Sequence, residues 1–183
     1  MSVEPWETLS DERLVKFKVF DVRKVRRRSP RNGDEIGFFV IDTWDWVDVV
    51  AFTDAGELIM IEQFRHGPGA ITLEIPGGVC NPCEDSRDTA IRELREETGY
   101  LARDVLRIGA VNPNPAIFTN TCTTFLALNC ELDGELQQDS GEDIRVVLVP
   151  WEKVEARVRA GEIDHSLVVS ALYFYRLHVE ATR

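Results

Sequence analysis

The chain has 183 residues, a length that suits one domain or one domain with a small appendage. Its formal net charge of -11 argues against a sequence-independent grip on nucleic acid, which needs clustered Lys and Arg. No apolar run of about 18 residues is present, and the polar stretch Met1–Asp11 lacks a signal-peptide core. We therefore expect a protein of the reducing cytoplasm, with no membrane span.

The first part of the chain predicts strands joined by short turns. The predicted strands cover residues 13–29, Glu35–Thr43, Val47–Thr53 and Glu57–Phe64. Turn residues at 29–34 and 54–56 separate them, and the second of these turns makes a hairpin. The basic run Arg23–Arg28 is most simply a solvated strand face, with contact to phosphate groups as the alternative.

The second part of the chain mixes helices with strands. The predicted helices are Asp85–Thr98, which Gly99 ends, Glu152–Ala160 and Ser166–His178. The predicted strands are Arg107–Val111, Thr121–Leu128 and Ile144–Val149. Because this order lacks strict βαβ alternation, it favours an α/β fold of the α+β type, a sandwich around a mixed sheet. We expect residues 1–43 to form a small antiparallel sheet and residues 44–183 to form the main domain.

Three glutamates of the first predicted helix lie on one helical face. At about 100° per residue, Glu93, Glu96 and Glu97 fall within an arc of roughly 100°. Like charges at this spacing repel, so something must offset them. Arg92 and Arg95 are candidates, and bound hard cations, which prefer carboxylate oxygens, are the alternative.

The complete pattern around these glutamates resembles the box that defines the Nudix hydrolases. It is Gly, five residues, Glu, seven residues, Arg-Glu, an aliphatic residue, any residue, Glu-Glu, any residue and Gly. The matching residues are Gly78, Glu84, Arg92, Glu93, Leu94, Glu96, Glu97 and Gly99. Tyr100 is one departure, since the pattern prefers an aliphatic residue there.

The resemblance implies a Nudix sandwich that binds two or three Mg²⁺ ions, for which Mn²⁺ can substitute. Carried across by position, the metal ligands are the carbonyl of Gly77 and the carboxylates of Glu93, Glu96, Glu97 and Glu142. Arg92 holds Glu84 and Glu93 in place by charge-assisted hydrogen bonds, and Gly78 and Glu84 are structural supports.

The sequence offers three candidates for the general base of such an enzyme. Glu142 aligns with the metal-facing acid of a late loop, whereas Ser140 stands where a related enzyme has its carboxylate base. A serine cannot act as a carboxylate base, so we rank Glu142 first, Glu96 second and Asp139 third.

Outside the box the chain resembles the ADP-ribose pyrophosphatases and related nucleoside-diphosphate-sugar hydrolases. The resemblance rests on Gln63-Phe64-Arg65, on Leu73–Gly78 before the box, and on Pro115, 15 residues after Tyr100. It implies a small-molecule nucleotide substrate and a homodimer that exchanges the N-terminal sheet. The implied substrate contacts are Arg65, Glu74, Pro115 and Asn120. The implied reaction splits the pyrophosphate, most readily that of ADP-ribose, into a nucleoside monophosphate and a sugar phosphate.

Several residues also have plainer interpretations. Arg65 can be a surface salt bridge, and Glu74 can be paired to an arginine. Cys80 and Cys83 fall in the variable part of the box, so ordinary reduced thiols are favoured over a zinc or redox pair. Trp44 and Trp46, at alternate positions of one strand, favour core or dimer contacts over base stacking.

Other activities are open as alternatives. The chain can be a sensor that binds a nucleotide sugar without turnover, although the intact glutamates disfavour this. Oxidised nucleoside triphosphates are disfavoured as substrates by the N-terminal sheet and Pro115. mRNA caps are disfavoured by the negative charge and the lack of a basic tract.

Overall fold

The computed structural model describes residues 2–134 and 143–182. Residue contacts divide the chain into two units, which are Met1–Trp44 with Asn112–Thr121, and Asp45–Val111 with Cys122–Arg183. Within the described residues, seven strands are followed by one helix, four strands and two helices, so the predicted α/β fold of α+β type is confirmed. No helix within the described ranges is long and apolar enough to cross a membrane.

The first unit contains a three-stranded antiparallel sheet in the order β1-β2-β3. Its strands are β1 (Glu7–Lys16), β2 (Phe20–Arg28) and β3 (Glu35–Thr43). The prediction of one strand over residues 13–29 was wrong, because the chain reverses after β1, where the amide of Phe17 donates to the carbonyl of Phe20 at 2.9 Å. The predicted turn after β2 is present, with the amide of Gly33 donating to the carbonyl of Ser29.

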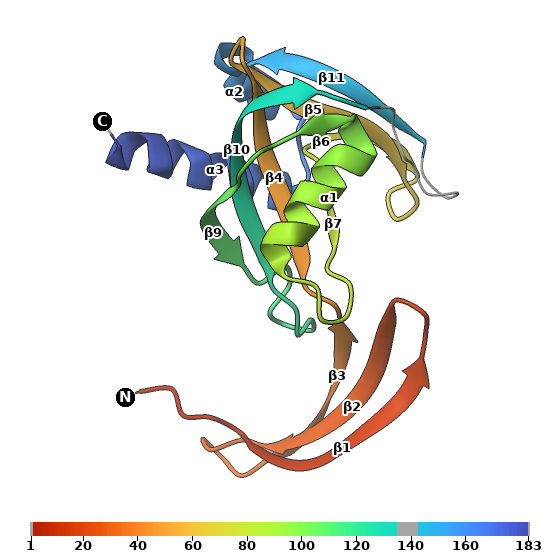
Figure 1. The fold of residues 1–183 in the computed structure, drawn as a ribbon. Helices are drawn as coiled ribbons and strands as arrows, with labels where there is room; N and C mark the ends of the chain where they lie inside the picture. Colours follow the sequence, from red (N-terminus) through yellow and green to blue (C-terminus); the bar gives the residue numbers. More distant parts are fainter. Residues whose placement is uncertain (1, 135–142, 183) are drawn as a thin grey trace. The chain divides into compact units, whose positions relative to one another are not determined.

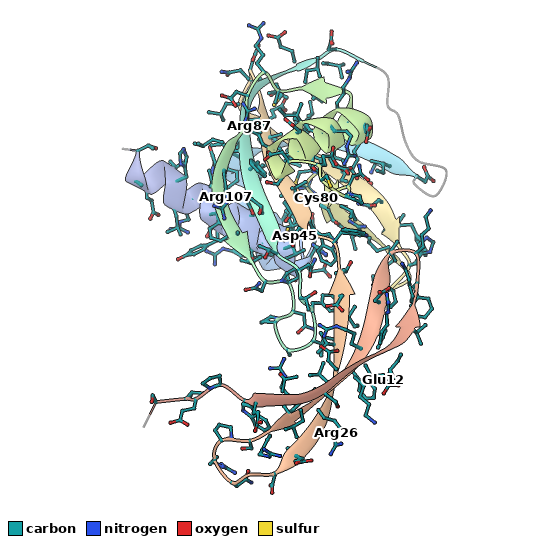
Figure 2. The ribbon with its side chains drawn as sticks, turned by 60° about the horizontal axis from the view of Figure 1, so that its bottom comes forward. Glu12, Arg26, Asp45, Cys80, Arg87 and Arg107 are labelled. Atoms are coloured by element: carbon teal, nitrogen blue, oxygen red, sulfur yellow. The ribbon has the colours of Figure 1, made fainter. Side chains whose placement is uncertain are left out.

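Arginines of the basic run of β2 pair with acids on the two neighbouring strands. Arg26 pairs with Glu35, and Arg28 pairs with both Glu7 and Glu35. Figure 2 shows Arg26 on this sheet. The simpler interpretation of these residues, a solvated strand face, therefore describes the structure.

The second unit is built on an eight-stranded sheet with the central order β11-β5-β4-β10-β8. Its strands are β4 (Trp46–Thr53), β5 (Glu57–Arg65), β6 (Ala70–Glu74), β7 (Gly77–Val79), β8 (Tyr100–Leu101), β9 (Leu106–Val111), β10 (Cys122–Leu132) and β11 (Ile144–Pro150). Strand β6 pairs with β5, β7 with β4, and β9 with β10. Since β4 and β10 are parallel and the other pairs are antiparallel, the sheet is mixed.

Helices cover both faces of this sheet (Figure 1). They are α1 (Ser86–Thr98), α2 (Trp151–Ala160) and α3 (Ser166–Ala181). Alternate residues of β4 point to opposite faces. Val47, Val49 and Ala51 therefore pack with Ala90 and Leu94 of α1, whereas Val50 and Phe52 share a cluster with residues of α2 and α3.

Helix α1 begins and ends where its capping residues predict. The side chain of Asp85 accepts a hydrogen bond from the amide of Arg87 at 2.8 Å, as an N-cap does. Gly99 adopts the left-handed conformation with φ of 72° and donates to the carbonyl of Arg95. These caps fix which residues of α1 face strand β7, and so they set the register of the glutamates.

Candidate active site

Two glycines of β7 bring the backbone against the carboxylates of α1. Strand β7 pairs with β4, and the amide of Gly77 donates to Oε2 of Glu97 at 2.9 Å. A Cβ at Gly77 would overlap the carbonyl oxygen of Val47, and one at Gly78 would lie 2.5 Å from the carboxyl carbon of Glu93. The close approach therefore requires glycine at Gly77, whereas a side chain at Gly78 would displace the carboxylate of Glu93.

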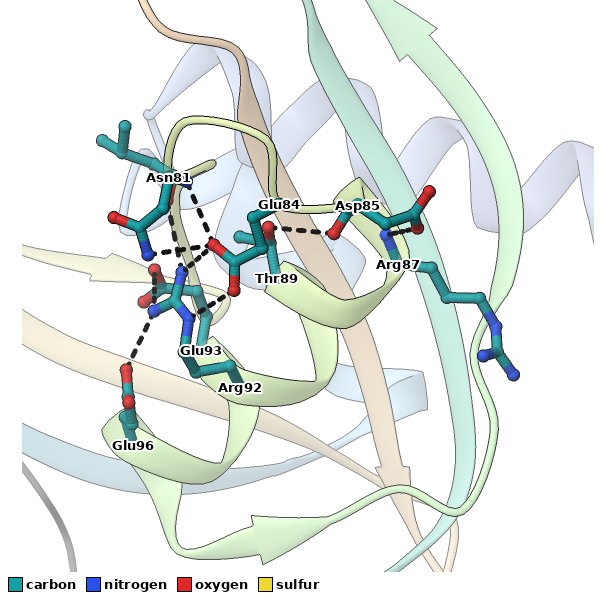
Figure 3. A network of polar contacts seen from close by, with 9 residues as sticks. Asn81, Glu84, Asp85, Arg87, Thr89, Arg92, Glu93 and Glu96 are labelled. Carbon is teal, nitrogen blue, oxygen red and sulfur yellow. Dashed lines mark hydrogen bonds and ion pairs between the residues drawn. The ribbon is translucent and has the colours of Figure 1, made fainter.

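Arg92 lies at the centre of three carboxylates (Figure 3). Its Nε and Nη2 donate to the two oxygens of Glu84 at 2.8 and 3.0 Å. Its Nη1 donates to Glu93 at 2.8 Å and to Glu96 at 2.9 Å. The contacts to Glu84 and Glu93 are those that the resemblance implies, and the contact to Glu96 is an addition.

The ionised form of the Glu84 carboxylate is strongly stabilised by this network. The hydrogen bonds from Arg92 lower the pKa of Glu84 to about 2, and the backbone amide of Asn81 assists. The same carboxylates raise the pKa of Arg92. Glu84 is therefore ionised at neutral pH and fixes the arginine, as a supporting residue does.

The donor set of this site fits hard divalent cations. Glu93, Glu96 and Glu97 offer carboxylate oxygens and Gly77 offers a carbonyl, the ligand types that Mg²⁺ prefers. A single guanidinium shared by three carboxylates also leaves an excess of negative charge beside β7. Among the described residues no three acidic, histidine or cysteine side chains are already gathered as metal ligands. Glu142, Ser140 and Asp139 lie outside the described residues.

Arg65 and Glu74 form a two-pronged ion pair across β5 and β6. Nε and Nη2 of Arg65 donate to the two oxygens of Glu74 at 2.8 and 2.7 Å, and the hydroxyl of Thr72 donates at 2.6 Å. Burial alone raises the pKa of Glu74, but these hydrogen bonds outweigh it and the pKa ends below its ordinary value. The side chain of Glu74 is 3% exposed and that of Arg65 is 44% exposed. Glu74 therefore holds an arginine that solvent and ligands can still reach.

Asp48 is a half-buried acid that the sequence reasoning missed. It lies on β4 opposite Gly77, and its carboxylate accepts a hydrogen bond from the thiol of Cys122 at 3.4 Å. Burial raises the pKa of Asp48 to about 6, and the negative charge of Glu74 adds to the effect. The signal was present, because Asp48 is a lone acid between the apolar residues Val47 and Val49.

The remaining candidates are divided between the two units. Pro115 and Asn120 belong to the first unit with Trp44, whereas Arg65, Glu74 and the box belong to the second. The amide nitrogen of Asn120 donates to the backbone carbonyl of Trp44 at 3.0 Å.

The structure corrects the prediction for the two tryptophans. Trp44 and Trp46 do not share a strand as predicted, because β4 begins only at Trp46 and Trp44 lies in the segment before it. All four cysteines are free, and burial raises the pKa of the Cys80 thiol.

The chain matches the model of the NUDIX domain over residues 42–169. It is 30% identical to the ADP-ribose pyrophosphatase of Bacillus subtilis (strain 168), over 93% of this chain and 92% of the relative. It therefore belongs to the NUDIX family, as the box over residues 78–99 indicates, and is an enzyme of the Nudix hydrolase class.

Two further comparisons agree with this assignment. The ADP-ribose pyrophosphatase of Mycobacterium tuberculosis (strain ATCC 25618 / H37Rv) is 28% identical over 94% of this chain and 84% of its own length. A solved structure titled as an ADP compounds hydrolase superposes with a TM-score of 0.86 over 100% of this chain and 98% of its own. At 21% sequence identity, the likeness to this solved structure supports the fold alone.

Proposed function

We propose that this protein hydrolyses the pyrophosphate of a nucleoside diphosphate sugar in a Mg²⁺-dependent reaction, with ADP-ribose as the first candidate. The observation that carries the proposal is the packing of the Gly77–Gly78 backbone against Glu93 and Glu97. The names of the relatives support the choice of substrate, since two of them are ADP-ribose pyrophosphatases. The products are a nucleoside monophosphate and a sugar phosphate.

In this proposal, different residues of the chain have different roles in the reaction. When bound, the divalent ions supply positive charge to the pyrophosphate oxygens and lower the pKa of a water molecule. Arg92 keeps Glu93 and Glu96 in register, and Glu74 holds Arg65 for contact with the substrate. Among the described base candidates, Glu96 has a side chain that is 37% exposed and can reach an attacking water. Glu142, the first choice from the sequence, remains a proposal.

A homodimer through the N-terminal sheet belongs to the same proposal. The sheet exposes large apolar side chains that a small unit cannot bury by itself. They include Phe17, Val19, Ile36, Phe38 and Phe39. Light scattering coupled to gel filtration measures the mass in solution, and a monomer would contradict this part of the proposal.

Product analysis over a small panel tests the activity. The panel contains ADP-ribose, GDP-mannose, UDP-glucose, a dinucleoside polyphosphate and an oxidised dGTP, each with Mg²⁺. Release of a nucleoside monophosphate and a sugar phosphate supports the proposal. Tight ADP-ribose binding with no turnover on any member would instead favour a nucleotide-sugar sensor.

Glu97→Gln tests the metal assignment within that activity. The variant keeps the shape of the side chain and its contact with the amide of Gly77, but removes the charge. We expect turnover to fall by about a thousandfold, while the circular dichroism spectrum stays unchanged. Glu152→Gln, an exposed residue of α2, is the matched control. Wild-type turnover by Glu97→Gln would exclude Glu97 as a metal ligand.

A further inference from the structure

The hairpin of β5 and β6 places four polar side chains on one face. Opposite residues of an antiparallel pair share a face, and Gln63 lies opposite Thr72. Residues two apart along a strand also share a face, so Arg65 lies beside Gln63 and Glu74 beside Thr72. Arg65 is the last residue of β5, and the amide of Gly69 donates to its carbonyl at 3.0 Å. These residues all belong to the second unit, so their arrangement is independent of the first.

The hydroxyl of Thr72 has one proton and two acceptors within reach. Its oxygen lies 3.4 Å from the backbone carbonyl oxygen of Gln63 and 2.6 Å from Oε1 of Glu74. A hydrogen bond between two oxygens is normally about 2.7–2.8 Å long, and one to an ionised oxygen is shorter and stronger. The ion pair with Arg65 keeps Glu74 ionised. The proton of Thr72 is therefore donated to Glu74.

This hydroxyl ties the ion pair of Arg65 and Glu74 to strand β6. Oε1 of Glu74 accepts from Nε of Arg65 and from Thr72, and Oε2 accepts from Nη2 of Arg65. The two bonds from the guanidinium keep the two planar groups aligned with each other. The last torsion of a glutamate side chain is broad, so the aligned pair could still turn as a unit. The bond from Thr72 opposes that rotation, because it comes from the strand itself.

The fixed pair leaves one edge of the Arg65 guanidinium for a ligand. The contact with Glu74 uses the edge formed by Nε and Nη2. The edge formed by Nη1 and Nη2 is left, and it can donate two parallel hydrogen bonds to one phosphate group. The side chain is 44% exposed, so such a ligand can approach it. The direction of this edge depends on the orientation of Glu74, and therefore on Thr72.

We propose that Thr72 is a positioning residue that orients Arg65, through Glu74, toward a phosphate group of the substrate. The inference rests on the proposed function, because it takes Arg65 as a substrate contact. Thr72 itself touches no substrate atom in this role. Its effect is on substrate affinity, since the pair of Arg65 and Glu74 lies on β5 and β6 and the glutamates of the box lie on α1.

Two substitutions of Thr72 separate the hydroxyl from the shape of the side chain. Thr72→Val keeps the β-branched shape that suits a strand but has no donor, whereas Thr72→Ser keeps the donor and loses a methyl group. We expect Thr72→Val to raise KM for ADP-ribose by about tenfold, the effect of one hydrogen bond to a charged acceptor. The value of kcat and the Mg²⁺ concentration for half-maximal activity should stay unchanged. Thr72→Ser should keep KM close to the wild-type value.

A double variant tests whether Thr72 acts through Arg65. Arg65→Lys cannot form the two-pronged pair with Glu74, so it should raise KM by itself. Thr72→Val should then add nothing in the Arg65→Lys background, because the side chain that it would misplace is already absent. The KM of the double variant should therefore equal that of Arg65→Lys, whereas independent effects would multiply.

Thr53→Val is the matched control for the loss of a threonine hydroxyl. Thr53 accepts a hydrogen bond from the amide of Glu57 at 3.2 Å, at the opposite end of β5 from Arg65. Its substitution should leave KM unchanged, and the circular dichroism spectrum of every variant should match that of the wild type. An unchanged KM in Thr72→Val, an equal rise in Thr72→Ser or Thr53→Val, or multiplying effects in the double variant would overturn the inference. Absence of wild-type turnover on the whole panel would instead sink the proposed function, and calorimetric ADP-ribose binding by the same variants would then decide the inference.

Discussion

At the scale of single residues, the chemistry of the site depends on the shape of one side chain. Arg92 satisfies three carboxylates because a planar guanidinium presents several donors in fixed directions, whereas an ammonium is a single point of charge. The low pKa of Glu84 expresses this contact. Its contribution to stability is fully present above the ordinary value of 4.5 and is lost as the pH falls toward about 2.

Arg92→Lys tests whether activity requires the planar guanidinium group at this position or only its positive charge. A lysine cannot grip Glu84 with two bonds and also reach Glu93 and Glu96, so the glutamates lose their register. We expect kcat to fall by about 10- to 100-fold and the Mg²⁺ concentration for half-maximal activity to rise. Steady-state kinetics over a Mg²⁺ titration measures both quantities.

The control for this variant lies on the same helix. Arg87→Lys alters an exposed pair with Asp104, and its kinetics should match those of the wild type. An Arg92→Lys enzyme with unchanged kcat and Mg²⁺ dependence would show that positive charge alone is sufficient at this position.

At the scale of elements, the sequence predicted the features that depend on residues close together in the chain. Asp85 and Gly99 predict the ends of α1, because an N-cap acceptor and a left-handed glycine act within one turn. The sequence did not predict the turn between β1 and β2, since Phe17-Lys18-Val19 contains no glycine or proline to mark it. The short strands β6, β7 and β8 were also not predicted, because their pairing with other strands defines them.

In the candidate site, too, the features set by local geometry were predicted and those set by distant pairing were not. The spacing of the box predicts which glutamates share a face of α1, since helical geometry is local. The contact of Glu97 with Gly77 spans 20 residues and depends on how β7 pairs with β4. The sequence marks Asp48 as an acid between two valines, but its contacts with Gly77 and Cys122 depend on how distant parts of the chain pair.

Gly77→Ala tests the requirement for a bare backbone in β7. The added methyl group would overlap the carbonyl of Val47, which belongs to the backbone of the central strand β4 and cannot move aside. We expect a loss of stability of about 3 kcal/mol and loss of turnover, measured by urea unfolding and by product release. Gly67→Ala is the control, since nothing lies within 4 Å of a Cβ at that exposed position. Equal stability of the two variants would contradict the close approach of β7 to β4.

At the scale of the whole molecule, the second unit carries a half-buried acid on its central strand β4, and this acid costs stability. Strand β4 is buried on both faces between α1 and the other two helices, yet Asp48 lies within it. Its carboxylate has a thiol as donor, and a thiol is a weak one. Ionisation is therefore disfavoured in the folded state, and the stability of the unit depends on pH through this residue.

The sign of that dependence follows from the raised pKa. The folded state holds the proton of Asp48 up to a pH of about 6, whereas the unfolded chain releases it near 3.8. Between these values the unfolded state binds fewer protons, so stability declines as the pH rises. Above about 6 the loss is constant, on the order of 3 kcal/mol.

Asp48→Asn removes the ionisable group and should remove this decline. Because the amide stays neutral, we expect the variant to gain several degrees in Tm over the wild type at pH 7.5, and the gain to vanish near about pH 4. Calorimetric scans in EDTA across this range measure the difference without bound metal. Asp54→Asn, in the exposed turn between β4 and β5, should show no such pH-dependent gain. If the gain in Tm for Asp48→Asn were the same at every pH, the difference in stability from the wild type would come from packing and not from the charge of Asp48.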